Sequence, residues 1–158
     1  MWQHAAVGLE DLLTTLGISL PPIPAPVASY IPVRVAGELA FVSGQVALVD
    51  GEVMHPGHVG AEVTVEQAQE AARRCALQAL SALRDTLGSL DRVRGIVQVS
   101  VFVASAPGFT EQPKVANGAS DLLVELLGDQ GKHARAAVGV AELPLGVPVE
   151  VALVVSIA

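Results

Sequence analysis

The chain has 158 residues, of which 51% are hydrophobic and only 3% are aromatic. This is enough for one ordinary domain with a core of Val, Leu, Ala and Ile, and it argues against several domains and against a disordered chain. Sixteen acidic residues against nine basic ones give a net charge of −7 and an isoelectric point near 4.9. Because such a surface repels phosphate, nucleic acid is a poor candidate partner.

The first residues show no sign of a targeting or membrane segment. Residues 1–17, MWQHAAVGLEDLLTTLG, contain acidic residues, no basic start and no uninterrupted apolar run. We therefore expect neither a signal peptide nor a membrane span, and a cytoplasmic location. The single cysteine, Cys75, cannot form an internal disulfide, which suits a reducing compartment.

The N-terminal third predicts a short helix, a connector and a hairpin. Apolar residues recur at near-helical spacing over residues 6–16 and stop at Gly17. The proline-rich segment SLPPIPAPV, residues 19–27, is typical of an extended connector. YIPVRV and ELAFVSGQV predict two strands joined across Ala36-Gly37, and a further short strand is expected near Val53.

The clearest predicted helix begins after Thr64 and ends at Gly88. Gln67 stands three residues after Thr64, which is the spacing of a capping box. The apolar residues that follow recur at steps of three and four: Val65, Ala68, Ala72, Cys75, Ala79, Leu83 and Leu87. Such a stripe needs a sheet to cover, and Cys75, which falls on it, is expected in the core.

The remaining segments complete an α+β pattern. Residues 95–104 predict a β-branched strand, residues 115–127 a second helix, and residues 133–141 and 148–157 two final strands. The predicted order is a leading helix followed by β-β-(β)-α-β-α-β-β. We expect one sheet with its two main helices on one face.

Two of the predicted strands each carry one ionisable side chain among small apolar residues. By strand alternation, Arg135 shares a face with Ala137, and Glu150 lies opposite the apolar face that begins at Val149. We expect the face without helices to carry Ile96, Phe102, Ala137, Ala152 and Val154. Such a face is too apolar for water, so it predicts self-association with Arg135 and Glu150 in or beside a subunit interface. A guanidinium there needs an anionic partner.

Several segments together resemble a known family: FVSGQ, VEQAQEAARRCALQALSAL, VSVFVAS and above all HARAAVGVAELPLGVPVEV. In this order they are similar to the Rid (YjgF-type) family of reactive-intermediate imine deaminases, also known as endoribonuclease L-PSP or translation-inhibitor proteins. PVASY and QPKVANGASDLLVELLG resemble a less characterised branch with a longer N-terminus. We therefore predict an N-terminal helix and connector over residues 1–24 and a single Rid-like domain over residues 25–158.

The resemblance implies a chorismate-mutase-like fold and a homotrimer with clefts between subunits. It also implies a hydrolase that converts 2-imino acids and their enamine tautomers to 2-oxo acids and ammonia, without a cofactor or a metal. By motif, the carboxylate-binding arginine of the family falls on Arg135, and the acidic residue near the reacting centre falls on Glu150. Further substrate-binding positions fall on Tyr30, Ser43, Asn117 and Ala137.

These residue types suit the implied chemistry. The planar fork of Arg135 can bind a carboxylate bidentately. Glu150 could activate a water for attack on the imine carbon or exchange a proton with the nitrogen, and Tyr30 could hold the water or the leaving ammonia. Many relatives have a cysteine where this chain has Ala137, which argues against a thiol nucleophile and leaves a backbone role open.

Each assignment has an alternative. Arg135 could form only a salt bridge with Glu150 or with another subunit, and Tyr30 could simply pack at the interface. Ser43 has no G-x-S-x-G elbow around it, so a structural role is favoured over a nucleophilic one. His133 could add positive charge to an anion site or be a surface or interface histidine.

His55 and His58 lie in HPGH, a loop without a ligand set at a recognised spacing, so the sequence predicts no metal site there. Three functions then remain open for the whole chain. The resemblance favours an imine deaminase acting on a small carboxylate. A trimeric protein that binds a small carboxylate without chemistry is the second, and a ribonuclease is the third. The acidic charge and the lack of a basic stripe count against the ribonuclease.

Overall fold

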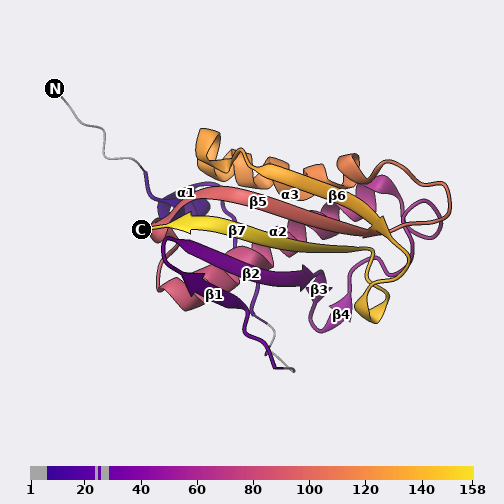
Figure 1. Cartoon of the computed structure of the whole chain (residues 1–158), viewed down its shortest axis with the longest axis horizontal. Helices are drawn as coiled ribbons and strands as arrows, with labels where there is room; N and C mark the ends of the chain where they lie inside the picture. Colours follow the sequence, from indigo (N-terminus) through magenta and orange to yellow (C-terminus); the bar gives the residue numbers. More distant parts are fainter. Residues whose placement is uncertain (1–6, 24, 26–28) are drawn as a thin grey trace.

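The computed structural model describes residues 7–23, 25 and 29–158, which form a sheet with helices on one side (Figure 1). The main sheet has five strands in the order β1-β2-β7-β5-β6, and β6 is parallel to β5 while the other neighbours are antiparallel. Its strands are β1 Val33–Ala36, β2 Leu39–Val46, β5 Val93–Ala104, β6 Ala134–Val140 and β7 Val149–Ile157. A small separate hairpin consists of β3 Leu48–Val49 and β4 Glu52–Val53.

The helices of the described residues are one short and two long ones. They are α1 Leu9–Thr15, α2 Val65–Leu87 and α3 Gln112–Leu127, with 3-10 turns η1 Leu90–Arg92, η2 Gly128–Gly131 and η3 Pro144–Gly146. The predicted α+β element order is confirmed. The helix expected at residue 115 begins at Gln112 instead, because Pro113 is well tolerated in the first turn, where its missing N–H has no helical partner. No helix in the described part of the chain is both long and apolar enough to cross a membrane.

The capping box of α2 is confirmed. The Gln67 N–H donates to Thr64 Oγ1 over 3.1 Å, and the Thr64 N–H donates to Gln67 Oε1 over 3.0 Å. At the other end Gly88 adopts a left-handed conformation with φ 83°, which suits glycine. Burial extends beyond the predicted stripe to Ala71, Ala76 and Leu80 among others, because α2 packs against both the sheet and α3.

The two faces of the sheet differ from the prediction in one respect. Arg135 and Ala137 pair with Val99 and Val101 of the parallel neighbour β5, which are fully buried under the helices. The expectation that Arg135, Ala137 and Ile96 lie on the face without helices is therefore wrong; Ile96 is part of the buried core. Strand alternation groups the residues of an edge strand correctly, but it does not identify the covered face when both faces carry small residues.

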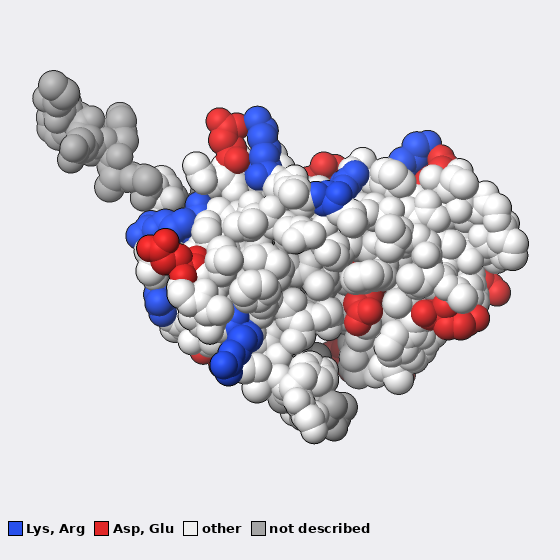
Figure 2. Space-filling model, in the orientation of Figure 1, with Lys and Arg blue, Asp and Glu red and all other residues white. Residues whose placement is uncertain are grey.

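The face without helices carries Glu150, Phe102, Ala152 and Val154, as predicted, since these alternate with the buried residues of β5 and β7. Phe41 and Val138 are 44% and 45% exposed there. Figure 2 shows this face, on which charged side chains lie mainly along the margins and most of the central surface is uncharged. A broad uncharged surface of this kind is unusual for an isolated domain.

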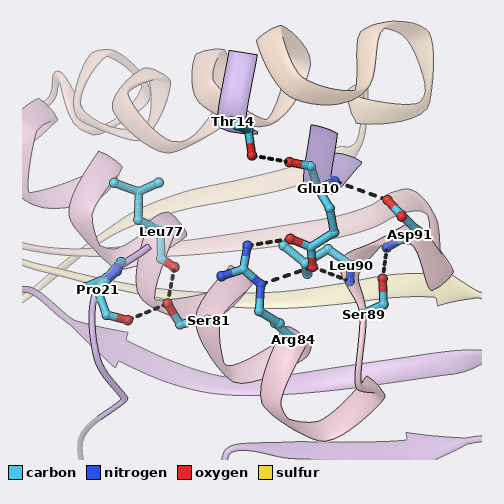
Figure 3. Close-up of polar contacts among 9 residues, drawn as sticks. All are labelled: Glu10, Thr14, Pro21, Leu77, Ser81, Arg84, Ser89, Leu90 and Asp91. Carbon is cyan, nitrogen blue, oxygen red and sulfur yellow. Dashed lines mark hydrogen bonds and ion pairs between the residues drawn. The ribbon is translucent and has the colours of Figure 1, made fainter. Parts of the chain in front are cut away.

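The short helix α1 is attached to the C-terminal end of α2 by a polar network (Figure 3). The Glu10 carboxylate accepts hydrogen bonds from Arg84 Nε at 3.0 Å, Arg84 Nη2 at 2.5 Å and the Leu90 N–H at 3.0 Å. The Glu10 N–H in turn donates to Asp91 Oδ1 over 3.1 Å. Further along the N-terminal segment, the Ser81 hydroxyl donates to the Pro21 carbonyl over 2.6 Å. The predicted domain boundary after residue 24 stays a prediction.

Gly118 of α3 lies against the backbone of α2. A Cβ added there would overlap the backbone carbonyl of Gln69. Helix propensity alone would make Gly118→Ala stabilising by about 1 kcal/mol, but overpacking costs about 1–3 kcal/mol, so we expect net destabilisation. Chemical denaturation against Asp121→Ala, an exposed position on the same helix, measures this difference. A more stable Gly118→Ala protein would contradict the described helix contact.

Glu10→Gln tests the attachment of α1. Hydrogen bonding to Arg84 lowers the pKa of Glu10 from its ordinary value of 4.5, against the opposing effect of burial. A carboxylate with a lowered folded-state pKa stabilises above its unfolded pKa and loses that contribution as the pH falls. Because Arg84 is partly exposed, we expect Glu10→Gln to lower the free energy of unfolding by about 1 kcal/mol at pH 7. The difference should shrink as the pH falls below about 4. Glu52→Gln, on the exposed hairpin, serves as the control.

Candidate functional site

Glu150 lines a cavity of about 360 Å³ near the end of β2 and the start of β7. The cavity wall is largely apolar, with Ile23, Pro32, Leu48 and Leu145 among its residues. The carboxyl is half-buried, and this burial raises its pKa above the ordinary value of 4.5. A buried carboxyl with a raised pKa can exchange protons nearer to neutral pH than an exposed one.

Glycine at position 44 makes the room that the Glu150 carboxylate occupies. A Cβ at Gly44 would lie 2.6 Å from Glu150 Oε1. The pairing of β2 with β7 shifts register between Val42 and Gln45, so a bulge contains this glycine. The SGQ segment thus serves the site through its backbone, by leaving space beside Glu150.

Tyr30 and Ser43 lie at the same end of the sheet. Tyr30 lines the Glu150 cavity and is 53% exposed. The Ser43 hydroxyl donates to the carbonyl of Ile31 over 2.7 Å, and the Ser43 N–H donates to the carbonyl of Pro32 over 2.8 Å. Ser43 therefore anchors the backbone next to Tyr30, and its hydroxyl proton is engaged.

Gln78 is a cavity residue that the sequence reasoning missed. It is only 3% exposed, yet it donates through Nε2 to the Val46 carbonyl at 2.8 Å and accepts from the Leu48 N–H at 3.2 Å. Arg74 supports the same loop by donating to the Leu48 carbonyl over 3.0 Å. A lone glutamine among the buried alanines of α2 is the signal that could have identified it.

A second group of side chains surrounds Arg135 on the helix side of β6. Arg135 Nη1 donates to Asn117 Oδ1 at 2.8 Å and to Ser120 Oγ at 3.1 Å. Asn117 and Ser120 are one turn apart on α3, so both face the guanidinium. The structure brings Arg135 and Asn117 together, and the Arg135 side chain remains exposed to solvent.

Ser120 and His133 also belong to this group and were not singled out together from the sequence. Ser120 Oγ lies 2.9 Å from His133 Nε2, and His133 Nδ1 lies 2.6 Å from the Gly131 carbonyl oxygen. Ser120 is buried. No motif marks the pair, but His133 shares the strand face of Arg135, which is the available signal.

Arg135 and Glu150 lie on opposite faces of the sheet within one chain. Arg135 pairs with Val99, whereas Glu150 pairs with Phe102, and these two β5 residues point to different sides. Ala137 lies on the side of Arg135 and is partly buried against the core. The prediction that both ionisable residues share one face is therefore wrong, and one chain does not bring them together.

Two histidines form contacts away from both groups. His55 Nε2 lies 2.6 Å from Glu70 Oε2. His58 Nε2 lies 2.9 Å from the Ala141 carbonyl and 3.2 Å from Glu142 Oε1, which raise the pKa of His58. Among the described residues, no group of three or more His, Cys, Asp or Glu side chains is arranged to hold a metal ion. The thiol of Cys75 is buried, which raises its pKa far above the ordinary range.

The chain is similar to several known proteins over most of its length. Protein TCP17 of Trypanosoma cruzi is 49% identical over 140 residues, which cover 88% of each chain. The protein Atu1372 of Agrobacterium tumefaciens, of unknown function, has a structure with TM-score 0.87 and 42% identity, covering 95% of this chain and 92% of its own. A "putative endoribonuclease" of Shewanella oneidensis has TM-score 0.90 and 30% identity, covering 95% of this chain and 99% of its own.

The two structural matches extend into the N-terminal segment, because residues 1–24 make up more than the uncovered 5% of the chain. This agrees with the resemblance to a branch with a longer N-terminus. The family model described as "YjgF/chorismate_mutase-like, putative endoribonuclease" matches residues 10–157. The chain therefore belongs to the YjgF family, also known as the Rid or endoribonuclease L-PSP family.

Proposed function

We propose that this protein hydrolyses 2-imino acids and their enamine tautomers to 2-oxo acids and ammonia, in clefts between the subunits of a homotrimer. The observation that carries the proposal is the division of the site between two faces of one sheet. Arg135 offers a carboxylate-binding group on one face, and Glu150 offers a proton-exchanging group on the other. A second copy that supplies Arg135 to the Glu150 cavity would complete the site and cover the uncharged sheet face.

Arg135 would bind the carboxylate of the substrate. Both hydrogens of Nη1 are directed at Asn117 and Ser120, so Nε and Nη2 remain to receive two carboxylate oxygens. This pairing fixes the orientation of the substrate and offsets its charge. The imine carbon then lies a short distance from the bound carboxylate, where a positioned water can reach it.

Glu150 would move the protons of the reaction. As a carboxylate it takes a proton from water, whose oxygen bonds to the imine carbon while the π electrons of the C=N bond pass to nitrogen. The nitrogen takes this proton from Glu150, which gives a carbinolamine with one amino and one hydroxyl group. Glu150 then accepts the proton of the hydroxyl group and passes it to the amino nitrogen, so that the C–N bond breaks, ammonia leaves and the C=O bond forms. The balance is one imino acid and one water to one 2-oxo acid and one ammonia, so water is the only co-reactant.

Supporting groups would hold the water and the leaving ammonia. Tyr30 lines the same cavity as Glu150, and Ser43 anchors the backbone beside it. The backbone carbonyl of Ala137 would help to orient the water, with alanine in place of the cysteine of many relatives. The raised pKa of Glu150 makes its carboxylate a stronger proton acceptor than that of an ordinary glutamate, and the protonated form then returns the proton to nitrogen.

A protein that binds a small carboxylate without chemistry is the second candidate. It is favoured by the fact that the Arg135 group is complete without Glu150 in one chain. Saturable binding of 2-oxo acids with no effect on imine loss would support it. A ribonuclease is disfavoured, since a net charge of −7 and a largely uncharged sheet face offer little attraction to phosphates.

Semicarbazide trapping of 2-imino acids, made in situ by an L-amino-acid oxidase, tests the role of Arg135. We expect the wild type to suppress trapping and Arg135→Ala to lose roughly 100-fold in kcat/KM, because a charge-assisted contact to the substrate is removed. Arg135→Lys keeps the charge but not the fork and should be intermediate. Exposed Arg94, near the start of β5, provides the matched control in Arg94→Ala.

Size measurement of each variant accompanies the trapping assay. If wild type and Arg135→Ala both remain trimeric and neither alters trapping for any side chain, the deaminase proposal is wrong for those substrates. If the wild type is a monomer at assay concentration and is still active, the division of the site between subunits is wrong.

The pH dependence of kcat tests Glu150. Since burial raises the pKa of Glu150 above 4.5, activity should fall as the pH drops through this raised value, earlier than for an ordinary glutamate. Glu150→Gln should lose roughly 100-fold to 10,000-fold in kcat and show no such acid limb. The rate is measured from pH 4 to 8 with imine production determined separately at each pH. An unchanged kcat in Glu150→Gln would remove it from the chemistry.

A further inference from the structure

A chain of hydrogen bonds runs from Arg135 to the backbone at the start of β6. Arg135 Nη1 donates to Ser120 Oγ at 3.1 Å, Ser120 Oγ lies 2.9 Å from His133 Nε2, and His133 Nδ1 lies 2.6 Å from the Gly131 carbonyl oxygen. Ser120 is buried and His133 is half-buried, so this chain lies behind the exposed guanidinium.

The direction of the chain follows from its last member. A carbonyl oxygen can only accept, so His133 Nδ1 carries the hydrogen of this contact. In the neutral ring Nε2 then accepts, and the hydroxyl of Ser120 is its donor. The oxygen of Ser120 keeps a lone pair for Arg135. Each group is satisfied in a single direction, from the guanidinium to the Gly131 carbonyl.

The fold holds the Gly131 end of this row of hydrogen bonds in place. A Cβ at Gly131 would overlap the backbone carbonyl of Leu123 on α3, so the polypeptide backbone at Gly131 passes α3 at a distance that only glycine allows. Ser120 lies on the same helix, one turn before Leu123. The Gly131 carbonyl packs against α3, and the Ser120 hydroxyl belongs to α3, so one helix positions both groups.

The contacts of Arg135 with Asn117 and Ser120 determine which edge of its guanidinium is free. Nη1 carries two hydrogens, and Ser120 and Asn117 each accept one of them. The remaining edge consists of Nε and Nη2, which is the pair that matches the two oxygens of a carboxylate. An arginine without such support samples many rotamers and loses them on binding, which weakens affinity.

We propose that Ser120 and His133 are positioning residues that hold the Arg135 guanidinium with its Nε and Nη2 edge turned to the carboxylate of the substrate. The inference rests on the proposed carboxylate-binding role of Arg135 and adds two residues to it. Ser120 acts directly on Arg135, and His133 acts through Ser120 by fixing the direction of its hydroxyl.

The first test compares Ser120→Ala, Ser120→Thr and His133→Phe in the trapping assay. Losing one hydrogen bond behind Arg135 should raise KM about fivefold to tenfold in Ser120→Ala and His133→Phe, with kcat within about twofold. Ser120→Thr keeps the hydroxyl and should restore KM. Affinity for 2-oxobutanoate should weaken in parallel, whereas that for the uncharged 2-oxobutanamide should not change. In an Arg135→Ala background, Ser120→Ala should have no further effect.

The second test observes Arg135 itself and does not depend on activity. The Nε–H signal of Arg135, identified by its absence in Arg135→Ala, should be ordered in wild type by ¹⁵N relaxation and less ordered in Ser120→Ala and His133→Phe. An unchanged order of Arg135 in both variants, or an unchanged KM alongside an active wild type, overturns the inference. If the wild type neither hydrolyses imines nor binds 2-oxo acids, the proposed function fails, and the relaxation data still decide whether Ser120 and His133 order Arg135.

Discussion

The helices cover only one face of the sheet, and the position of every functional side chain depends on this. Arg135 is held against the helix layer by α3, whereas Glu150 starts from the opposite face of the sheet and lines a cavity that extends to Gln78 of α2. Exposed apolar residues such as Phe41 and Val138 make that face a surface that favours burial. In the proposed assembly, burial of this face and completion of the site are one event, because the same contact would bring Arg135 of one copy to Glu150 of another.

Each long helix supports one half of the proposed site. α2 reaches the Glu150 cavity through Gln78, which fixes the backbone where β2 ends. α3 reaches the other half through Ser120 and Asn117. The two helices meet at Gly118, where no side chain separates them from direct backbone contact. A change in helix packing would therefore shift both halves of the site, although neither helix carries a group proposed to do chemistry.

Local sequence patterns predicted the helices and strands well. They did not predict features that depend on pairing between distant segments, such as the face on which Arg135 lies. The capping box at Thr64 and Gln67 and the order of helices and strands along the sequence follow from short-range rules, and both are confirmed. The face of Arg135 depends on its pairing with Val99, thirty-six positions earlier, which alternation within one strand does not reveal. Gln78 and Ser120 were missed for the same reason, since their partners are backbone and side-chain atoms of other elements.

Several energetic costs of the fold lie around Glu150. Its carboxyl is half-buried with no nearby cation contributing to its pKa in the single chain, and it requires glycine at position 44. Leu145, which lines the same cavity, has φ 62°, a conformation that is unfavourable for a residue other than glycine. Arg135, in contrast, is exposed, and its Nη1 is hydrogen-bonded to Asn117 and Ser120. Such costs persist where selection maintains a function, and an arginine supplied by a second copy would offset the charge that the isolated chain leaves partly desolvated.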